Sequence, residues 1–209
     1  FAGHPTLGSA HVARALGLGG DALVLELEAG LVPVTAEGHR WTLTAARAPA
    51  VREPAAAPDE LAAMLGLAPG AVGRARWVDT GVEQLVVPLA TAADVAAARP
   101  SAEALDRLAR LPGGEAMAYV WAEAAPGEVE ARFFFMAGGG VVEDPATGSA
   151  CANLGVGLLA TGAPLPARRL VRQGRAVQRP SELRLEVTAE GAVRVSGEVV
   201  ELGRGTMRV

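Results

Sequence analysis

Apolar and polar residues alternate in three neighbouring stretches near the start of the chain: ALVLELEA (22–29), LVPVTAEG (31–38) and HRWTLTAA (39–46). An alternation with period two is typical of strands that bury one face. Gly30 and Gly38 lie between these stretches, where a tight turn needs a flexible residue. The pattern predicts three antiparallel strands joined by hairpins.

Similar alternation returns further along the chain. Thr80-Gly81 and Pro126-Gly127 are turn signals that each separate two apolar stretches, and two more stretches close the sequence. The expected strands therefore lie in RARWVDTGVEQLVVPL (74–89), EAMAYVWAEA (115–124), EVEARFFFMA (128–137), SELRLEV (181–187) and AVRVSGEVVEL (192–202).

Helices are expected between these groups of strands. Proline is favoured at the first helical position, and a Ser or Thr before a helix accepts a hydrogen bond from its first turn. The first predicted helix begins at Pro5 and ends near Leu16, before Gly17. The others cover 58–67, 91–98 and 101–111, and a last one starts at the Asp-Pro pair of EDPATGSA, with Asp144 as its cap and Pro145 at its first position, and ends at about Ala160.

Two domains are expected from this order of elements. The segment ARAPAVREPAAAP (46–58) is rich in Pro and Ala and is typical of a linker. We place the boundary there, which gives residues 1–46 and 47–209, with the last strand possibly returning to the first domain. Residues 21–46 alone would make an open sheet with bare edges. We therefore expect a further segment, on the order of 70–100 residues, before residue 1: a segment of the same protein, a separate chain, a cleaved piece or a part lost by deletion.

An internal repeat supports two similar domains. GHPTLGSA at the start and EDPATGSA in the second half align with a constant offset of 140 residues. His4 then pairs with Asp144, Gly8 with Gly148 and Ser9 with Ser149. The alignment predicts two glycine turns, each opening a helix, that face each other across one cleft.

Composition excludes several kinds of chemistry. All 19 basic residues are Arg, so a lysine Schiff base, including one to pyridoxal phosphate, is excluded within this chain. The single Cys151 excludes a two-thiol racemase and an intrachain disulfide, and is compatible with a cytoplasmic location. Few His and Cys residues make a zinc site improbable. A net charge of −4 gives no reason to expect nucleic acid, and no apolar run is long enough to span a membrane.

The two turns carry the candidate chemistry. Backbone N–H groups of residues 146–149 would lack helical partners and would bind a carboxylate or an oxyanion. Histidine titrates near neutrality and suits proton transfer. Asp144 can exchange protons or simply cap the helix, and His4 can be catalytic or structural. Ser149 is not in a G-x-S-x-G elbow, which argues against a serine hydrolase, and Cys151 and His11 are more simply packing residues.

Four stretches, GHPTLGSAHVA, TGVEQLVVPL, RFFFMAGGGVVEDPATGSACANLG and QGRAVQRPSEL, resemble the PhzF family of phenazine-biosynthesis isomerases. The resemblance covers essentially the whole chain. It implies an α+β, diaminopimelate epimerase-like fold, in which two pseudo-symmetric domains each wrap a mostly antiparallel, barrel-like sheet around a central helix. It also implies catalysis without cofactor or metal. The characterised phenazine-pathway member isomerises trans-2,3-dihydro-3-hydroxyanthranilate by a proton shift.

The resemblance also implies a set of site residues. His4, Asp144 and Ser149 match the family's active-site residues, whereas its principal acid/base Glu lies before GHPT and has no counterpart here. We expect a cofactor-independent isomerase or epimerase of a small carboxylic acid, possibly homodimeric. The alternative is a non-catalytic binding or structural relative that lacks this Glu. The expected substrate-binding residues are Gly3, Thr6, Gly8, Ser9, Thr147 and Gly148.

Overall fold

A computed structural model describes residues 3–27, 30–45 and 49–206. One continuous sheet runs through them in the order β1-β2-β3-β12-β11-β10-β8-β7-β6-β5-β4, with β9 paired to β8. The β6–β7 and β8–β10 pairs are parallel and all other pairs are antiparallel. The strands are β1 (Ala22–Leu27), β2 (Gly30–Glu37), β3 (Arg40–Thr44), β4 (Ala50–Arg52), β5 (Arg76–Asp79), β6 (Glu83–Pro88), β7 (Met117–Ala125), β8 (Glu128–Ala137), β9 (Gly140–Asp144), β10 (Ala167–Gln173), β11 (Ser181–Val187) and β12 (Val193–Glu198).

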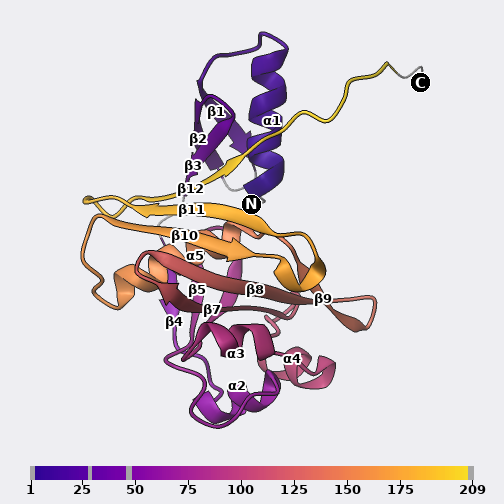
Figure 1. Ribbon diagram of the computed structural model, residues 1–209, viewed down its shortest axis with the longest axis vertical. Coiled ribbons are helices and arrows are strands. Elements are labelled where there is room, and N and C mark those ends of the chain that lie inside the picture. Colours follow the sequence, from indigo (N-terminus) through magenta and orange to yellow (C-terminus); the bar gives the residue numbers. More distant parts are fainter. Residues whose placement is uncertain (1–2, 28–29, 46–48, 207–209) are drawn as a thin grey trace.

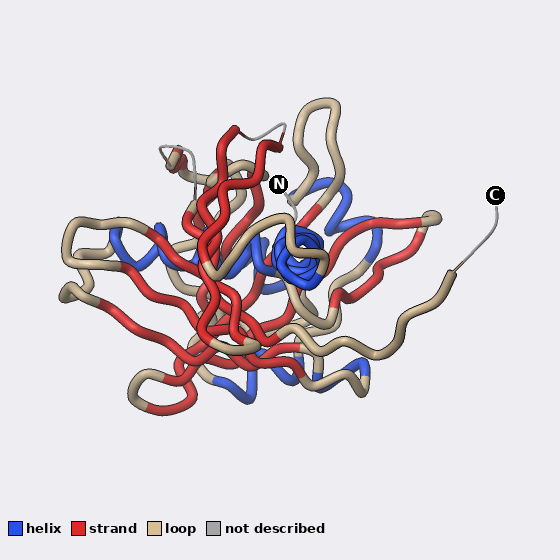
Figure 2. Tube along the Cα trace, turned by 90° about the horizontal axis from the view of Figure 1, so that it is seen from above, coloured by secondary structure: helices blue, strands red, loops and turns tan. Residues whose placement is uncertain are grey.

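The first part of the chain forms a small N-terminal lobe, which consists of α1 (Gly3–Ala15) and β1–β3. α1 stands beside these strands, as the view down its axis shows (Figure 2). Val32, Val34, Trp41 and Leu43 alternate with more exposed residues along β2 and β3 and are buried beneath the helix side of the lobe. β12 pairs with β3 and thereby joins the lobe to the rest of the sheet (Figure 1).

The central helix α5 (Gly148–Ala160) is buried within the sheet formed by the rest of the chain. It contacts β5 and β6 on one side and β11 and β12 on the other, so the curved sheet wraps around it. Every residue from Ser149 to Val156 is buried. A helix that is apolar on all sides is expected in such a central position.

Three short helices cover the outer surface of the β4–β9 region (Figure 1). They are α2 (Pro58–Met64), α3 (Ala92–Ala97) and α4 (Ala102–Leu108), and a 3₁₀ turn (Arg175–Val177) follows β10. Side chains such as Leu61, Leu85 and Leu105 form a second core between these helices and the sheet. Thr91 and Ser101 cap α3 and α4, as the sequence predicts.

The sequence-based predictions are confirmed for the three N-terminal strands and the 117–137 hairpin, and the α+β fold is as expected. The predicted linker 46–58 is wrong in part, because residues 50–52 form β4 at the sheet edge; residues 46–48 lie outside the described residues. The sequence pattern does not predict β9 and β10. Charged residues interrupt the apolar pattern in β10, and β9 is short and follows three glycines.

Exposed apolar side chains gather on the N-terminal lobe. Val12, Leu16, Leu18, Val24 and Leu31 are each more than half exposed. Leu7, also on α1, is buried instead, because it faces β12 near Gly197. Among the described residues, no helix is long and apolar enough to cross a membrane.

Candidate active site

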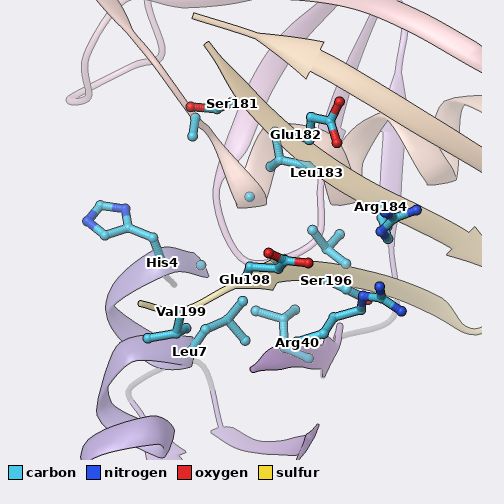
Figure 3. A pocket seen from close by; sticks show the side chains of 16 residues that line it. His4, Leu7, Arg40, Ser181, Glu182, Leu183, Arg184, Ser196, Glu198 and Val199 are labelled. Carbon is cyan, nitrogen blue, oxygen red and sulfur yellow. The ribbon is translucent and has the colours of Figure 1, made fainter. Parts of the chain in front are cut away.

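A pocket of about 400 Å³ opens where α1 meets β11, β12 and the start of α5 (Figure 3). His4 and Leu7 project from the first turns of α1, and Glu198 and Ser196 come from β12. Arg184 on β11 and Arg40 on β3 add positive charge to the opposite side. The lining residues are Gly3, His4, Leu7, Arg40, Leu43, Ala146, Gly148, Ser181, Glu182, Leu183, Arg184, Val195, Ser196, Gly197, Glu198 and Val199.

The first turns of α1 and α5 meet at two glycines. A Cβ atom on Gly3 would lie 3.0 Å from the Cα atom of Gly148, and one on Gly148 would lie 3.2 Å from the Cα atom of Gly3. Only residues without a side chain allow this approach. The first backbone N–H groups of a helix have no partner within it and carry its positive dipole end. Both helices therefore present anion-binding ends to one place at the pocket.

Asp144 is held in a turn just ahead of α5. Its Oδ2 atom accepts a hydrogen bond from the hydroxyl of Thr147 (2.5 Å), and its backbone carbonyl accepts one from the Gln173 side chain (2.8 Å). Gln173 also donates to Thr147 Oγ1 (3.0 Å) and accepts from the Thr147 backbone N–H (3.3 Å). In the described part of the chain, the Oδ1 atom of Asp144 has no hydrogen-bond partner, so one carboxylate oxygen is left for a ligand.

Gly174 packs the following turn against this site. Its φ is +82°, in the left-handed region that glycine favours. A Cβ atom there would collide with the carbonyl oxygen of Arg179 and come within 2.6 Å of the Pro145 carbonyl oxygen. The glycine therefore lets Gln173 reach the Asp144 turn from directly beneath it.

The structure corrects two predictions at this turn. Thr147, not Asp144, is the N-cap residue of α5, and the helix begins at Gly148 instead of following Pro145 directly. The backbone N–H groups available to a ligand therefore differ from the predicted groups of residues 146–149, because the Gln173 side chain already accepts from the Thr147 N–H. The groups without helical partners are those of residues 148–150.

The offset of 140 residues is also wrong as a structural equivalence. α1 already includes Gly3, so His4 lies in its first turn, whereas Asp144 lies four residues before α5. The two glycines that meet, Gly3 and Gly148, are 145 residues apart. Pro5 is accommodated inside the first turn because its missing N–H would have no helical partner there.

The other predicted residues divide into two groups. Gly3, His4 and Gly148 line the pocket, whereas Asp144, Ser149 and the rest are not among its lining residues. Ser149 is buried and accepts a hydrogen bond from Gln84, which sequence analysis did not single out. Of the remaining expected binding residues, Thr6 and Thr147 are buried, Gly8 is half-buried and Ser9 is exposed.

Several polar residues at the pocket were missed because they carry no local sequence motif. The Nε atom of Arg40 is buried and has no hydrogen-bond partner in the described structure, although the rest of the side chain is partly exposed. Arg40 also lies directly across from Glu198 in the β3–β12 pair. Among the described residues, no group of three or more His, Cys, Asp or Glu side chains is arranged to bind a metal ion.

Cys151 is fully buried in α5, and burial raises the pKa of its thiol to about 12. The thiol therefore stays protonated, and unreactive, near neutral pH. We expect iodoacetamide at pH 8 to leave Cys151 unlabelled in the native protein and to label it fully in denaturant, as measured by intact mass. Rapid labelling of the folded protein would contradict this assignment.

Comparisons with known proteins place this geometry in a family. The family model described as "Phenazine biosynthesis-like protein" matches residues 1–205. The chain belongs to the PhzC-PhzF family. An uncharacterised isomerase of Pasteurella multocida is 29% identical over 209 residues, which cover all of this chain and 70% of the relative.

Solved structures of PhzF-like proteins share the fold. A predicted epimerase from Pseudomonas aeruginosa is 31% identical, with a TM-score of 0.72 over 100% of this chain and 75% of that one. A PhzF-family phenazine biosynthesis protein from Bacillus anthracis is 21% identical, with a TM-score of 0.75 over 95% of this chain and 73% of that one. The PhzF-like chain therefore has the α+β, diaminopimelate epimerase-like fold that the resemblance implies, and the relatives from Pasteurella multocida and Pseudomonas aeruginosa are named an isomerase and an epimerase.

Proposed function

We propose that this PhzF-like protein is an isomerase or epimerase that shifts a proton on a small carboxylic acid without a cofactor. The observation that carries the proposal is the contact between Gly3 and Gly148, which brings two helix N-termini together beside His4. Preorganised N–H groups aimed at one point stabilise a negative charge that develops during a reaction. An enolate-like intermediate carries that kind of charge.

His4 and Asp144 are the proposed assistants of proton transfer. The imidazole of His4 stands at the pocket edge (Figure 3), and Asp144 keeps one carboxylate oxygen unbonded within the described residues. In the proposed reaction a base removes a proton from carbon, and the electron pair moves into the conjugated acid. The same proton, or one from an opposing acid, is then returned to another carbon or to the other face, so no electrons enter or leave.

The substrate's carboxylate would bind beside Arg40 and Arg184, the two guanidinium groups of a pocket that Glu182 and Glu198 also line. The N–H group of Gly148 offers a donor on one side of the pocket, and Arg40 and Arg184 offer guanidinium groups on the other. Ser149 follows Gly148 in the same first turn and would add its hydroxyl. This distribution favours a substrate with at least one carboxylate and little bulk, as a volume of about 400 Å³ allows.

We assign the principal base to the Glu that the resemblance implies on a segment preceding GHPT. Support for such a segment comes from the N-terminal lobe, where Val12, Leu16, Leu18, Val24 and Leu31 are exposed. Burying each of these side chains would contribute roughly 1.5–3 kcal/mol. A strand or helix laid over this surface would stabilise the lobe, and the part of the same segment that reaches the start of α1 would carry the Glu to His4.

The proposal is tested by exchange of carbon-bound hydrogen with solvent. The full-length encoded protein is incubated in D₂O with trans-2,3-dihydro-3-hydroxyanthranilate and with a panel of small amino and hydroxy acids, and each acid is analysed by mass spectrometry and NMR. We expect one acid to gain a single deuterium or to isomerise, and a His4→Gln variant to react at least tenfold more slowly. Acids that bind without any exchange would instead identify a binding protein and overturn the isomerase proposal.

A further inference from the structure

A series of buried polar side chains connects Ser149 to β6 and to the turn between β5 and β6. Gln84 on β6 donates from Nε2 to Ser149 Oγ (3.1 Å), and its Oε1 accepts from Asn153 Nδ2 (2.9 Å). Asn153 also donates to the backbone carbonyl of Val82 (3.0 Å), and its Oδ1 accepts from Thr80 Oγ1 (2.8 Å). Thr80, Gln84, Asn153 and Ser149 are all more than nine-tenths buried.

One atom fixes which group donates and which accepts in each of these hydrogen bonds. The Val82 carbonyl oxygen can only accept, so the Asn153 atom that faces it must be the nitrogen. The same nitrogen reaches Gln84, whose facing atom must therefore be the oxygen. The Gln84 nitrogen is then left to face Ser149 and can only donate. A main-chain carbonyl thus determines the orientation of both amides without reference to hydrogen positions.

This direction determines what Ser149 can do. A serine hydroxyl has one hydrogen to donate and two lone pairs that accept. Gln84 occupies a lone pair, and within the residues that the structure describes it is the hydroxyl's one hydrogen-bond partner. The hydrogen of Ser149 is therefore not used by the protein and is free for an acceptor at the helix N-terminus.

We infer that Gln84 is a positioning residue that keeps the Ser149 hydroxyl as a hydrogen-bond donor to an anionic group of the ligand, such as a carboxylate. The inference deepens the proposed function and rests on it for the identity of the site. Gln84 touches no ligand in this assignment and acts through Ser149. Asn153 and Val82 have the further role of preventing the Gln84 amide from rotating.

A Gln84→Glu variant tests the inference by reversing the last hydrogen bond. The ionised carboxylate that this substitution introduces accepts only, so Ser149 must turn its hydrogen away from the ligand and towards the carboxylate. When that carboxyl group is protonated, it donates to Ser149 Oγ as the amide did, while its other oxygen still accepts from Asn153. Burial raises the pKa of a carboxyl group, which moves this change towards neutral pH.

The measurement is the affinity for anthranilate, a stable carboxylic acid, by calorimetry between pH 6 and 9, where an ordinary carboxylic acid is ionised. We expect the Gln84→Glu variant of the full-length encoded protein to bind roughly tenfold more weakly at pH 9 and to approach wild-type affinity towards pH 6. The titratable groups on the elements packed around Gln84 are Asp79 and Glu83 on the β5–β6 hairpin, Tyr119 on β7 and Cys151 on α5. These groups, and His4 and Asp144 at the helix ends, are shared by the wild-type control. Glu83 is paired with Arg52, and the pKa of Cys151, about 12, keeps it neutral throughout.

Repulsion between the introduced carboxylate and the ligand could also weaken binding. A double-variant cycle distinguishes this effect from a reversed Ser149 hydrogen bond. In a Ser149→Ala background the hydroxyl is absent, so the pH-dependent loss caused by Gln84→Glu should largely disappear. A loss of equal size in both backgrounds would mean repulsion alone and would overturn the inference. Unchanged affinity of Gln84→Glu at every pH, with normal binding by the wild type, would overturn it too and leave the proposed function intact.

A second measurement needs neither ligand nor the Gln84→Glu variant. The side-chain amide resonances of Gln84 are compared between the wild type and Ser149→Ala by ¹H–¹⁵N NMR. Loss of the Ser149 acceptor should shift one Gln84 NH₂ proton upfield and speed its exchange with solvent. If the wild type binds no carboxylic acid, the proposed function fails. Whatever the binding result, a Gln84 resonance that does not move in Ser149→Ala would overturn the orientation assigned to Gln84.

Discussion

An Asp144→Asn variant of the full-length encoded protein is expected to catalyse exchange of the substrate's carbon-bound hydrogen with solvent roughly 10²–10⁴-fold more slowly than the wild type. A factor of this size is the usual contribution of a positioned acid or base. The substitution removes the titratable carboxylate and keeps an oxygen in the same place. That oxygen can still accept the hydrogen bond from Thr147, and the backbone carbonyl still accepts from Gln173. Thermal stability should therefore change little, and activity is measured by deuterium incorporation from D₂O.

A matched control is available in α3. Asp94 also accepts a hydrogen bond from a threonine hydroxyl three residues away (Thr91, 2.6 Å), but it lies on an exposed helix remote from the pocket. Asp94→Asn should leave the exchange rate unchanged. If Asp144→Asn retained full activity, Asp144 would have only a structural role in the turn before α5.

An Arg132→Met variant is expected to destabilise the protein by about 3–5 kcal/mol, because it leaves a buried carboxylate without its cation. Arg132 on β8 forms two hydrogen bonds with Glu143 on β9 (2.6 and 3.1 Å), and both side chains are about nine-tenths buried. The guanidinium also donates to the carbonyl oxygens of Val95 and Ala98 at the end of α3. For a chain of this size the loss corresponds to a fall in Tm of roughly 6–20 °C in a thermal melt.

Two further variants show whether this loss comes from the unpaired charge. Arg74 pairs with Glu53 at 2.7 Å, but both side chains are largely exposed, so Arg74→Met should cost at most about 1 kcal/mol. The double variant Arg132→Met/Glu143→Leu removes both buried charges and should recover much of the loss. A single Arg132→Met variant as stable as Arg74→Met would show that the buried pair contributes little. Because Glu143 immediately precedes Asp144, the same comparison reports on how firmly the turn that holds Asp144 is anchored.

Elements with strong local signals were predictable from sequence. The hairpins around Gly38 and Pro126-Gly127 combine turn residues with alternating strands, and Thr91 and Ser101 mark helix starts. β10 and β4 were not predictable in this way. Arg side chains break the alternation in β10, and β4 consists of three exposed residues inside a Pro- and Ala-rich segment that pairs with β5. Pairing with a distant strand, which no local pattern encodes, makes such residues extended.

The candidate site shows the same division. GHPT and EDPATGSA could be found because glycine, proline and a titratable residue lie close together in the sequence, and Gly3, His4 and Gly148 do line the pocket. Gln84, Asn153 and Gln173 could not be found in this way. Each forms hydrogen bonds with residues that are distant in the sequence, so no local motif marks it. The offset between the two motifs could not be checked from the letters alone, because α1 and α5 begin at different places within their motifs.

The pairing of β3 with β12 also governs the order in which the protein can form during synthesis. Leu43 pairs with Val195, so β3 leaves the ribosome long before its partner has been made. At ordinary translation rates this interval is on the order of ten seconds. Throughout it the nascent N-terminal hairpins present an unpaired strand edge, which is a site for mispairing with other chains. Cellular yield should thus depend on chaperone occupancy of these first strands and on translation speed, more than on the stability of the finished enzyme.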